Sequence, residues 1–466
     1  MFTAIVEFRL PGRGQGHRFC PALPALRALH PIIGNALQRL WSAALLPALL
    51  LPLSALAQPT LSLDGALMLA QQRSRQLAAQ DALAASSRQM ALAAGQLPDP
   101  TLKLGVSNLP VTGPDRYSFT SDFMTMRSVG VAQEFTRADK RKARTARFER
   151  EVEVAQAGRA VLLANLRRDT AMAWLERHYL ERMLELLKTQ RTETGLQTDA
   201  ADAAYRGGRG AQADVFAARS AVALLDDRIR QAEQQITVAK TKLARWVGDA
   251  AGQTLAAPPS LWAVRLHTQG LEAQLAHHPQ IALMQAQEAV ARAEVGMAQA
   301  NQQSDWSIEL MYSLRGSAYS NMISLNASIP LQWDQKNRQD REVSAKLSLA
   351  EQMQAQREEA TRAHVAEIRA WLQEWQSNQQ RLAHYDSALI PLATERARAT
   401  VAAYRGGSSA LATVLEARRM EIDTRVDRLR LEMETAARWA QLEYLTAPEP
   451  QAIAKDPLTK ATEAPQ

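Results

Sequence analysis

Cysteine is nearly absent from this sequence of 466 residues, since Cys20 is its one copy. Cys20 lies in an N-terminal segment that we expect to be removed. Its context, His17-Arg18-Phe19-Cys20, lacks the small and apolar residues of a lipoprotein cleavage box. A mature chain without cysteine can form no disulfide, no thiolate metal site and no lipid anchor on cysteine.

The segment that we expect to be removed is a predicted signal peptide at residues 1–57. Arg39 precedes a short apolar run over residues 40–53, and Ala55-Leu56-Ala57 gives the small-x-small pattern of a cleavage site. The alternative is a membrane anchor, but the run is short and contains two prolines. We therefore predict that the mature chain starts at Gln58.

Long hydrophobic runs are absent from the rest of the sequence. No later segment has about 18 uninterrupted apolar residues, so the sequence predicts no transmembrane helix. An exported protein without such a helix is either soluble in the periplasm or a β-barrel.

A strong excess of one charge is also missing once residues 1–57 are set aside. The whole chain carries a formal charge of +7, and residues 1–57 contribute five arginines against one glutamate, or +4, which leaves about +3. This remainder is too small and too scattered to indicate DNA or RNA binding.

Catalytic motifs are absent as well. The sequence has no nucleotide-binding loop, no nucleophile elbow and no zinc-protease helix. The histidine pair His277-His278 has no nearby carboxylate or cysteine, so a surface pair is a better interpretation than a metal site. We therefore predict that the protein is not an enzyme and holds neither a cofactor nor a resident metal.

What the sequence does contain is an internal duplication. Tyr205-Arg206-Gly207-Gly208 recurs 199 residues later as Tyr404-Arg405-Gly406-Gly407, and each copy is followed in register by a valine and a closing Ala-Arg. Glycine reaches left-handed backbone angles at little cost, so each Gly-Gly predicts a chain reversal between two helices.

The same order of elements surrounds both copies. Alternation of apolar and polar residues predicts strands, and long stretches of Ala, Leu, Arg, Glu and Gln predict helices. The first repeat, residues 58–247, has a helix at 62–97, a β-hairpin at about 101–134, a long helix at 136–204 and a return helix at 211–247. The second, residues 270–445, has a helix at 270–303, a β-hairpin at about 306–330, a long helix at 336–403 broken only at Pro391, and a return helix at 410–445. Residues 248–269 are a predicted linker, and residues 446–466 are a predicted disordered tail.

The predicted fold class is mainly α with a small β part: duplicated long helical hairpins that form a coiled-coil tunnel, plus two β-hairpins per chain. Four strands are too few to close a transmembrane barrel, which needs about eight, so we expect three chains to supply twelve. One set of side chains is expected to face lipid: Leu102, Leu104, Val106, Ile308, Leu310 and Tyr312. The alternate set is expected to face a wet lumen: Lys103, Ser107, Ser307 and Glu309. A soluble sandwich is the alternative, but it would bury these charged alternates at a cost.

This order of elements resembles the TolC-type outer-membrane factor family over essentially the whole mature chain. Its marks are Leu97-Pro98-Asp99-Pro100, Gln133-Glu134-Phe135, the basic stretch 140–144, and Tyr-x-x-Gly followed by an apolar-x-x-Ala-Arg pattern at both helical turns. The resemblance implies a homotrimer in outer-membrane lipid, with a tapering tunnel in the periplasm. It also implies docking with a periplasmic adaptor and an inner-membrane RND-type pump, which supplies the energy.

The resemblance also implies where the periplasmic entrance lies. The tips of the helical hairpins, where the adaptor would bind, match Gly207, Gly208, Gly406 and Gly407. Asp214, Tyr404 and Glu416 match positions that form the constriction. Thr413 stands where some members of the family carry an aspartate, so this entrance is expected to be less acidic.

The loop from Asn108 to Met126 resembles a branch of the family associated with heavy-metal efflux, particularly of copper. Met124 and Met126 could offer thioethers to Cu(I), although packing of the loop near the membrane is the better interpretation of these side chains. Metal, drug and type I secretion ducts share one architecture, so all three cargoes stay open. The alternative of another class is a soluble periplasmic coiled-coil scaffold or adaptor.

Overall fold

The computed structural model describes residues 60–264 and 278–445. The predicted signal peptide, the predicted tail and residues 265–269 of the predicted linker lie outside the described residues, as does His277. Within the described ranges, no helix is both long enough and apolar enough to cross a membrane.

One helix runs through most of the first repeat. The span without proline that predicted a long helix forms α3, Ala138–Arg206, which is a single helix of 69 residues. At a rise of 1.5 Å per residue, its length is roughly 100 Å. After the glycine pair the chain returns along α3 as α4, Gln212–Val247.

The second repeat has the same order of helices, but its long helix contains one π-helical turn. It comprises α7, Gln339–His384, a π-helical segment η3, Tyr385–Leu389, then α8, Ile390–Arg405, and α9, Leu411–Glu443. A break was predicted at Pro391. Instead, the helix widens locally just before this proline, and the chain stays helical through it. A proline has no N–H and its ring clashes with the carbonyl four residues earlier, and one π-helical turn relieves both problems.

The short helices differ from the predicted ones at their ends. Residues 62–97 form two helices, α1, Leu63–Arg73, and α2, Arg75–Ala94, instead of one. Ser74 separates them, because its extended backbone leaves the helix and its hydroxyl accepts the Leu77 N–H at 3.4 Å, which starts α2. In the second repeat α6, Pro279–Ala300, starts with a proline in its first turn.

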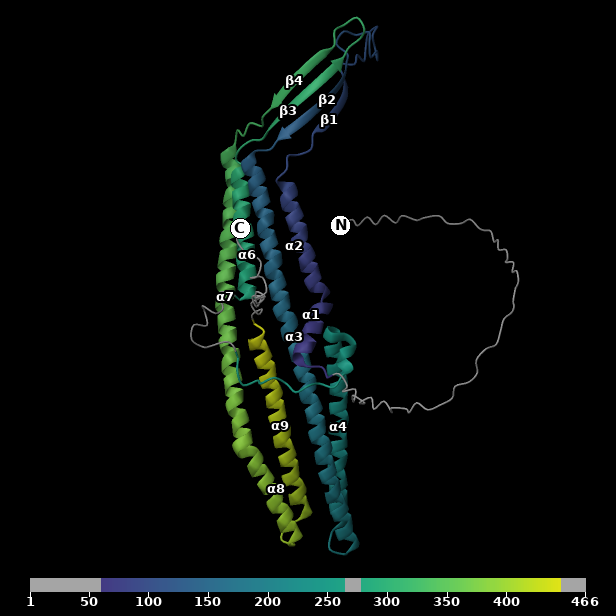
Figure 1. Cartoon of the computed structure of the whole chain (residues 1–466), viewed down its shortest axis with the longest axis vertical. Helices are drawn as coiled ribbons and strands as arrows, with labels where there is room; N and C mark the ends of the chain where they lie inside the picture. The colour runs from purple at the N-terminus through teal and green to yellow at the C-terminus, as the bar shows by residue number, and fades with distance from the viewer. Residues whose placement is uncertain (1–59, 265–277, 446–466) are drawn as a thin grey trace, which may run out of the picture. The chain divides into compact units, whose positions relative to one another are not determined.

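The two hairpins join into one antiparallel sheet. Its strands are β1, Thr101–Ser107, β2, Met126–Phe135, β3, Trp306–Leu314, and β4, Met322–Ser328, in the order β1-β2-β3-β4. Strands β2 and β3 pair over nine residues, from Arg127 with Leu314 to Phe135 with Trp306. Strands β1 and β4 are therefore the edges of an open sheet, which lies beyond one end of the helices (Figure 1).

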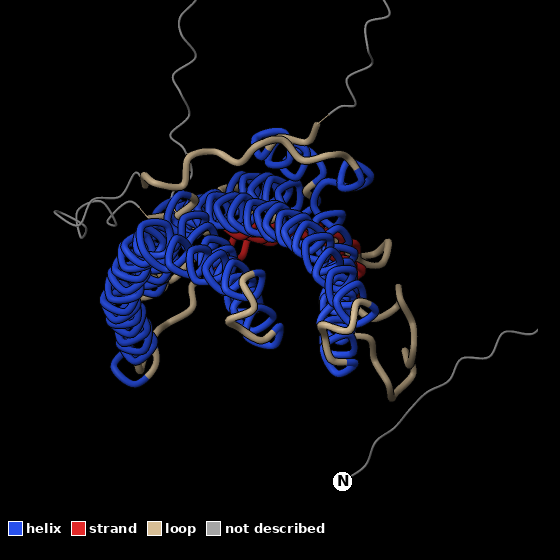
Figure 2. Tube along the Cα trace, turned by 90° about the horizontal axis from the view of Figure 1, so that it is seen from below, coloured by secondary structure: helices blue, strands red, loops and turns tan. Residues whose placement is uncertain are grey.

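The helices lie side by side as a curved layer (Figures 1 and 2). Near the sheet, neighbouring helices contact one another in the order α2, α3, α6, α7. Farther from the sheet, α3 lies between α4 and α9, and α8 packs on α9. A single layer of helices has two broad faces and two lateral edges, so its core is thin.

The main core lies at the middle of this layer. It contains the fully buried Trp174 and Leu243, together with Ile368 and Ala440. A short 3-10 helix, η1, Gly248–Gly252, and the extended chain after it cross this region, and Leu255 forms a parallel bridge with Leu61. Buried side-chain donors hold the bridged segments, around Leu61 and after Val247, in place. Trp174 donates to the Leu61 carbonyl at 3.1 Å, and Arg177 donates to the carbonyls of Ala251 and Gln253 at 2.8 Å each.

Candidate functional site

Both helical hairpins turn with the same backbone bonds. Gly208 and Gly407 have φ of +70° and +72°, the left-handed region that glycine adopts without strain. Gly207 and Gly406, the residues that cap the two helices, have φ of −79° and −78°, so only the second glycine of each pair requires left-handed angles. The N–H groups of the second glycines donate to the carbonyls of Tyr205 and Tyr404, at 3.0 Å in each case.

Asp214 acts first as a helix cap. It lies in the first turn of α4, and its carboxylate accepts the N–H of Ala211 at 3.3 Å. A carboxylate at this position also interacts favourably with the positive end of the helix. Its fractional exposure is intermediate, so it fixes the start of α4 at the tip while part of the carboxylate meets solvent.

Tyr404 lies half-buried against the apolar cluster that joins the two hairpins. The buried members of this tip cluster come from three helices: Ala201 of α3, Val215 and Ala218 of α4, and Leu411 and Val414 of α9. Its counterpart Tyr205 is exposed, so the duplicated tyrosines have different surroundings. The tyrosine of the second repeat therefore helps to hold the two tips together.

Glu416 lies on the exposed face of α9, and Thr413, one turn earlier, is exposed beside it. Among the described residues no hydrogen bond or ion pair joins Asp214, Tyr404 and Glu416. One chain thus places all three at its tip end without bringing them into one cluster.

A ladder of ion pairs behind the tip was missed by sequence reasoning. Its first rung is centred on Glu421, which is 2% exposed. The carboxylate of Glu421 accepts from Arg418 and Arg425 at 2.8 Å each, and from the hydroxyl of Thr394 on α8 at 3.0 Å. The spacing of these arginines from Glu421, three and four residues, is visible in the sequence, but the contact with α8 is not.

The second rung lies nearer the middle of the layer. Arg428 of α9 donates to both carboxylate oxygens of Asp386 in η3, at 2.7 and 3.1 Å, and also pairs with Glu432. The hydroxyl of Tyr179 on α3 donates to Glu432 at 3.3 Å. Burial raises the pKa of Tyr179, and the charge of Glu432 raises it further, so this phenol stays protonated and remains a donor. The ladder therefore ties η3 and α9 to α3.

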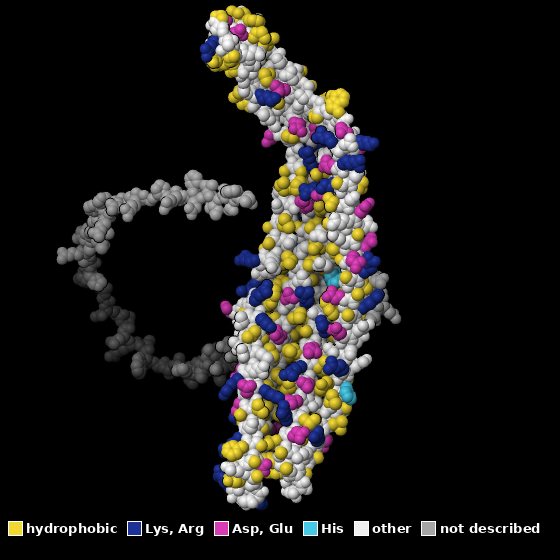
Figure 3. Space-filling model, turned by 180° about the vertical axis from the view of Figure 1, so that it is seen from behind, with side chains coloured by type: hydrophobic (Ala, Val, Ile, Leu, Met, Phe, Trp, Pro, Cys, Tyr) yellow, Lys and Arg dark blue, Asp and Glu magenta, His cyan; other side chains and the backbone are white. Residues whose placement is uncertain are grey.

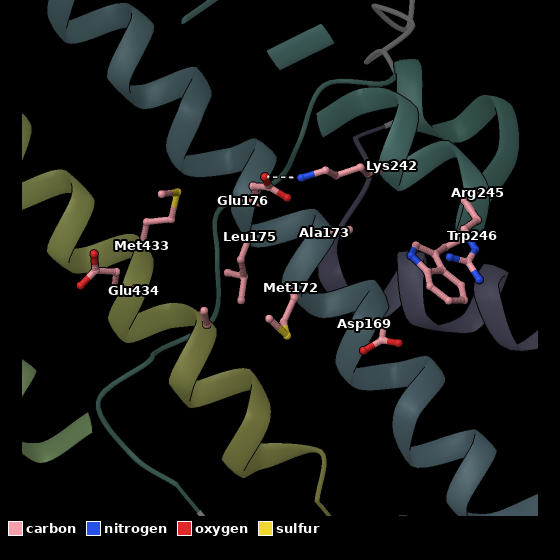
Figure 4. A pocket seen from close by; sticks show the side chains of 11 residues that line it. Asp169, Met172, Ala173, Leu175, Glu176, Lys242, Arg245, Trp246, Met433 and Glu434 are labelled. Atoms are coloured by element: carbon pink, nitrogen blue, oxygen red, sulfur yellow. Dashed lines mark hydrogen bonds and ion pairs between the residues drawn. The ribbon is translucent and has the colours of Figure 1, made fainter. Parts of the chain in front are cut away.

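A groove runs along the layer between α3, α4 and α9, and Figure 4 shows its lining. Its volume is about 510 Å³, and Lys242 of α4 reaches across it to Glu176 of α3 at 2.8 Å. Met172, Trp246 and Met433 supply apolar surface beside these charges. The groove is a mixed surface, with three carboxylates, Asp169, Glu176 and Glu434, against two cations, Lys242 and Arg245. Among the described residues no three His, Cys, Asp or Glu side chains come together as metal ligands.

The sheet has one apolar and one polar face, as its alternation predicted. Cross-strand register puts Leu102, Val131, Leu310 and Leu325 in one row, and Leu104, Val129, Tyr312 and Ile323 in the next. These side chains are exposed, up to 73% for Leu104 and Ile323.

The opposite face of the sheet is polar. Lys103 of β1 forms an ion pair with Glu309 of β3 across β2. Ser128, Ser313, Ser324 and Asn326 occupy the same side by register. The predicted alternation of the two faces is therefore confirmed.

No protein-family model and no curated protein matches this chain. Several solved structures match the fold of this chain. The outer-membrane channel OprN matches with a TM-score of 0.69 at 16% sequence identity, over 82% of this chain and 89% of that chain. The outer membrane protein VceC from Vibrio cholerae matches with a TM-score of 0.67 at 18% identity, over 82% of this chain and 95% of that chain. CusC, described in terms of transmembrane channel formation, matches with a TM-score of 0.69 at 15% identity, over 84% of this chain and 93% of that chain. At these identities the likeness establishes a shared fold.

Proposed function

We propose, from the premise that this chain has the fold of the TolC-type outer-membrane channels, that it is one protomer of a passive export duct. Three copies would close a twelve-stranded barrel in the outer membrane, and their helices would continue as a tunnel in the periplasm. The duct would form the exit of a tripartite efflux system.

The observation that carries the proposal is the exposed apolar face of the sheet. Eight large side chains in two neighbouring rows would cost free energy in water, at roughly 25 cal/mol for each Å² of apolar surface. Lipid removes this cost, while the polar reverse face, with Lys103 and Glu309, suits a wet lumen. An open sheet cannot stay in lipid, because the edge strands β1 and β4 would keep unpaired backbone groups. Further copies that pair β1 with β4 satisfy both requirements.

The helical layer supports the same assembly. The outermost helices near the sheet carry large exposed apolar side chains, among them Leu83, Met90 and Leu92 on α2 and Leu347 and Leu349 on α7. A curved single layer with apolar edges is the shape expected of one segment of a closed wall, since neighbouring copies would cover both edges.

The tips would form the periplasmic entrance and the docking surface for partners. In the trimer, three copies of Asp214, Tyr404 and Glu416 would converge, and Glu416 supplies an exposed carboxylate for a polar constriction. The turns at Gly207, Gly208, Gly406 and Gly407 would receive the periplasmic adaptor, and an inner-membrane RND-type pump would drive transport. The chain itself would catalyse no reaction.

Heavy-metal cations such as copper are the proposed cargo. The support is the resemblance of the loop from Asn108 to Met126, in which Met124 is exposed. Deletion of the gene should lower tolerance to copper or silver. Unchanged tolerance to copper, silver and zinc, with increased sensitivity to drugs, would replace this cargo with drugs and leave the duct in place.

The duct itself is tested by fractionating cells and measuring the mass of the purified protein in detergent. We expect the full chain in the outer-membrane fraction, extracted only by detergent and with the mass of three chains. A periplasmic protein that is monomeric or dimeric without detergent would contradict the proposal and favour the coiled-coil scaffold.

A further inference from the structure

The apolar face of the sheet continues beyond the end of β4. Ile329, Leu331 and Trp333 keep the alternation of Ile323 and Leu325, and all five are exposed, Trp333 at 88%. Between Leu331 and Trp333, the Gln332 amide donates to the carbonyl of Asn301 at 3.2 Å, so this side chain turns inward. The apolar stripe therefore reaches to the start of the helices and ends in a tryptophan.

The neighbouring strands also end in aromatic side chains near the helices. Phe135 at the end of β2 and Trp306 at the start of β3 are paired in register, and their rings stack with centroids 4.4 Å apart. Both belong to the apolar face, because they continue the alternation of Val131 and Leu310. Aromatic rings at the border of an apolar surface are typical of the interface between lipid tails and headgroups.

Cationic side chains follow these aromatics in both repeats. The first two turns of α3 carry Arg141, Lys142 and Arg144. In the second repeat, Lys336 and Arg338 lie just before α7, and Arg341 lies in its first turn. Apart from Arg141, which is half-buried, all are exposed. None of the six forms an ion pair with another residue that the structure describes. On the face drawn in Figure 3, Lys and Arg side chains lie just below the sheet, with Asp and Glu side chains among them.

Nearby carboxylates compensate the cations of the second repeat but only part of those of the first. Asp334, Asp340 and Glu342 stand among Lys336, Arg338 and Arg341, and the neutral amides of Asn337 and Gln302 leave the charges of Asp334 and Asp340 in place. In the first repeat Asp139 pairs with Arg137, and Asp305 pairs with Lys140 at 2.8 Å and also interacts with Arg144. Glu149 borders the same hollow as Arg141 and Lys142, about three turns from the start of α3. The excess of positive charge at the start of α3, below the apolar face of the sheet, complements an anionic amphiphile.

We propose that this collar, Phe135, Trp306 and Trp333 with the six cations, binds the headgroups of anionic phospholipids on the helix-facing side of the membrane. The proposal rests on the proposed membrane duct and names its lipid partner. Acyl chains cover the stripe from Ile323 to Leu331, and the phosphates lie at the cations of α3 and α7. Each cation close to an anionic lipid surface strengthens binding by several fold, so the effect accumulates around the collar.

The test uses the full chain, purified in an uncharged detergent, with bound lipid counted by native mass spectrometry. Phosphatidylglycerol and phosphatidylcholine with the same acyl chains are offered at equal mole fraction. We expect phosphatidylglycerol to bind at least about ten-fold more strongly. Inorganic phosphate at the same concentration should not displace it, because the acyl chains contribute to binding.

Two variants with equal charge change locate the effect. The collar variant replaces Lys142, Lys336, Arg338 and Arg341 with Gln, and the preference should fall to within about two-fold. The control variant replaces Arg219, Arg230, Lys240 and Arg405 with Gln. These are exposed cations on α4 and at a tip, so the preference for phosphatidylglycerol should stay as in the wild type.

The outcomes separate the collar from the duct. A wild-type protein that conducts ions in neutral-lipid bilayers but binds both lipids equally would overturn the collar alone. Equal loss of preference in the two variants would also overturn it, because total charge would then be the cause. A wild-type protein that enters no bilayer would overturn the collar together with the proposed function.

Discussion

Glu421 is a buried carboxylate whose neighbours explain why it can stay charged. Two arginines and one hydroxyl from α8 and α9 surround it, so the charge is compensated inside the layer. Glu421→Gln keeps the shape but leaves two guanidinium groups without their anion. We expect the free energy of unfolding to fall by about 2 kcal/mol.

Thermal or chemical unfolding in detergent measures this loss. The matched control is Glu395→Gln on α8, since Glu395 and its partner Arg398 are both 68% exposed. We expect the control to change stability by less than about 0.5 kcal/mol. Equal effects of the two substitutions would show that the buried position of Glu421 has no special role.

His278 makes the stability of the helical layer depend on pH. Its Nδ1 accepts the Gln280 N–H at 3.2 Å, which caps α6, and its Nε2 lies 3.3 Å from Nε2 of His364 on α7. Burial, together with the charge of the neighbouring His364, lowers the pKa of His278 to about 4. Burial also lowers the pKa of His364, whose Nδ1 lies 3.6 Å from Glu367, and Arg168 of α3 faces the same hollow.

The unfolded chain takes up a proton at its ordinary pKa near 6.5, and the folded chain does so only near 4. Stability should therefore be full above pH 6.5 and fall as the pH drops from 6.5 towards 4, by about 3 kcal/mol at most from His278. His278→Asn keeps a cap acceptor and removes this titration, so its unfolding curves should vary less over that range. The same pH dependence in the variant would exclude His278 as the cause.

Glu416 is the residue that tests the proposed entrance. Three exposed carboxylates at a constriction would attract cations, so Glu416→Ala should lower the preference for cations over anions in planar bilayers. Glu359→Ala, an exposed carboxylate on α7, serves as the control. Conductance and ion selectivity equal to those of the wild type would remove Glu416 from the constriction.

Among the elements, the long helices and their turns could be predicted because their signals are local. The absence of proline predicted the whole of α3, and the glycine pairs predicted both chain reversals. The break at Ser74 was missed, because a serine between two helical stretches is a weak signal. Pro391 was predicted to interrupt the helix, but whether the chain breaks or widens there depends on packing against α9.

The site is less predictable than the elements. Asp214, Tyr404 and Glu416 were predicted through a resemblance, and their place at a constriction stays a prediction. The structure adds the capping bond of Asp214 and the tip cluster around Tyr404. The ladder was missed, because partners such as Asp386 and Arg428 are 42 residues apart and meet only when η3 packs on α9. Long-range ion pairs leave no periodic pattern in one sequence.

The tip turn offers a test that is confined to one element. Gly407 has a positive φ, and a Cβ there would meet no other atom within 4 Å, so Gly407→Ala changes the backbone preference alone. We expect the tip to lose about 1 kcal/mol. Gly406→Ala is the control, because Gly406 has a helical φ and its Cβ would meet carbonyl oxygens at an ordinary 3.6 Å.

Hydrogen exchange at the tip measures the effect. Exchange of the amides around Ser408 should become faster in Gly407→Ala and stay near the wild-type rate in Gly406→Ala. Equal exchange in the two variants would show that the left-handed turn does not limit the stability of the tip.

For the whole molecule, one chain leaves several surfaces uncovered. The sheet has two free edges and an exposed apolar face, and the outermost helices near the sheet, α2 and α7, carry exposed apolar side chains. The sequence predicted that four strands are too few to close and that one face of them is apolar, but it did not predict which side chains stay exposed on α2 and α7. Closure by copies of the same chain would cover these surfaces together.

The conductance of the purified full chain in planar lipid bilayers tests this central claim most directly. A trimeric duct should give discrete, long-lived steps of conductance from protein with the mass of three chains, with current proportional to voltage over a range of small potentials. Protein that remains in solution, or that binds the bilayer without steps of conductance, would contradict it.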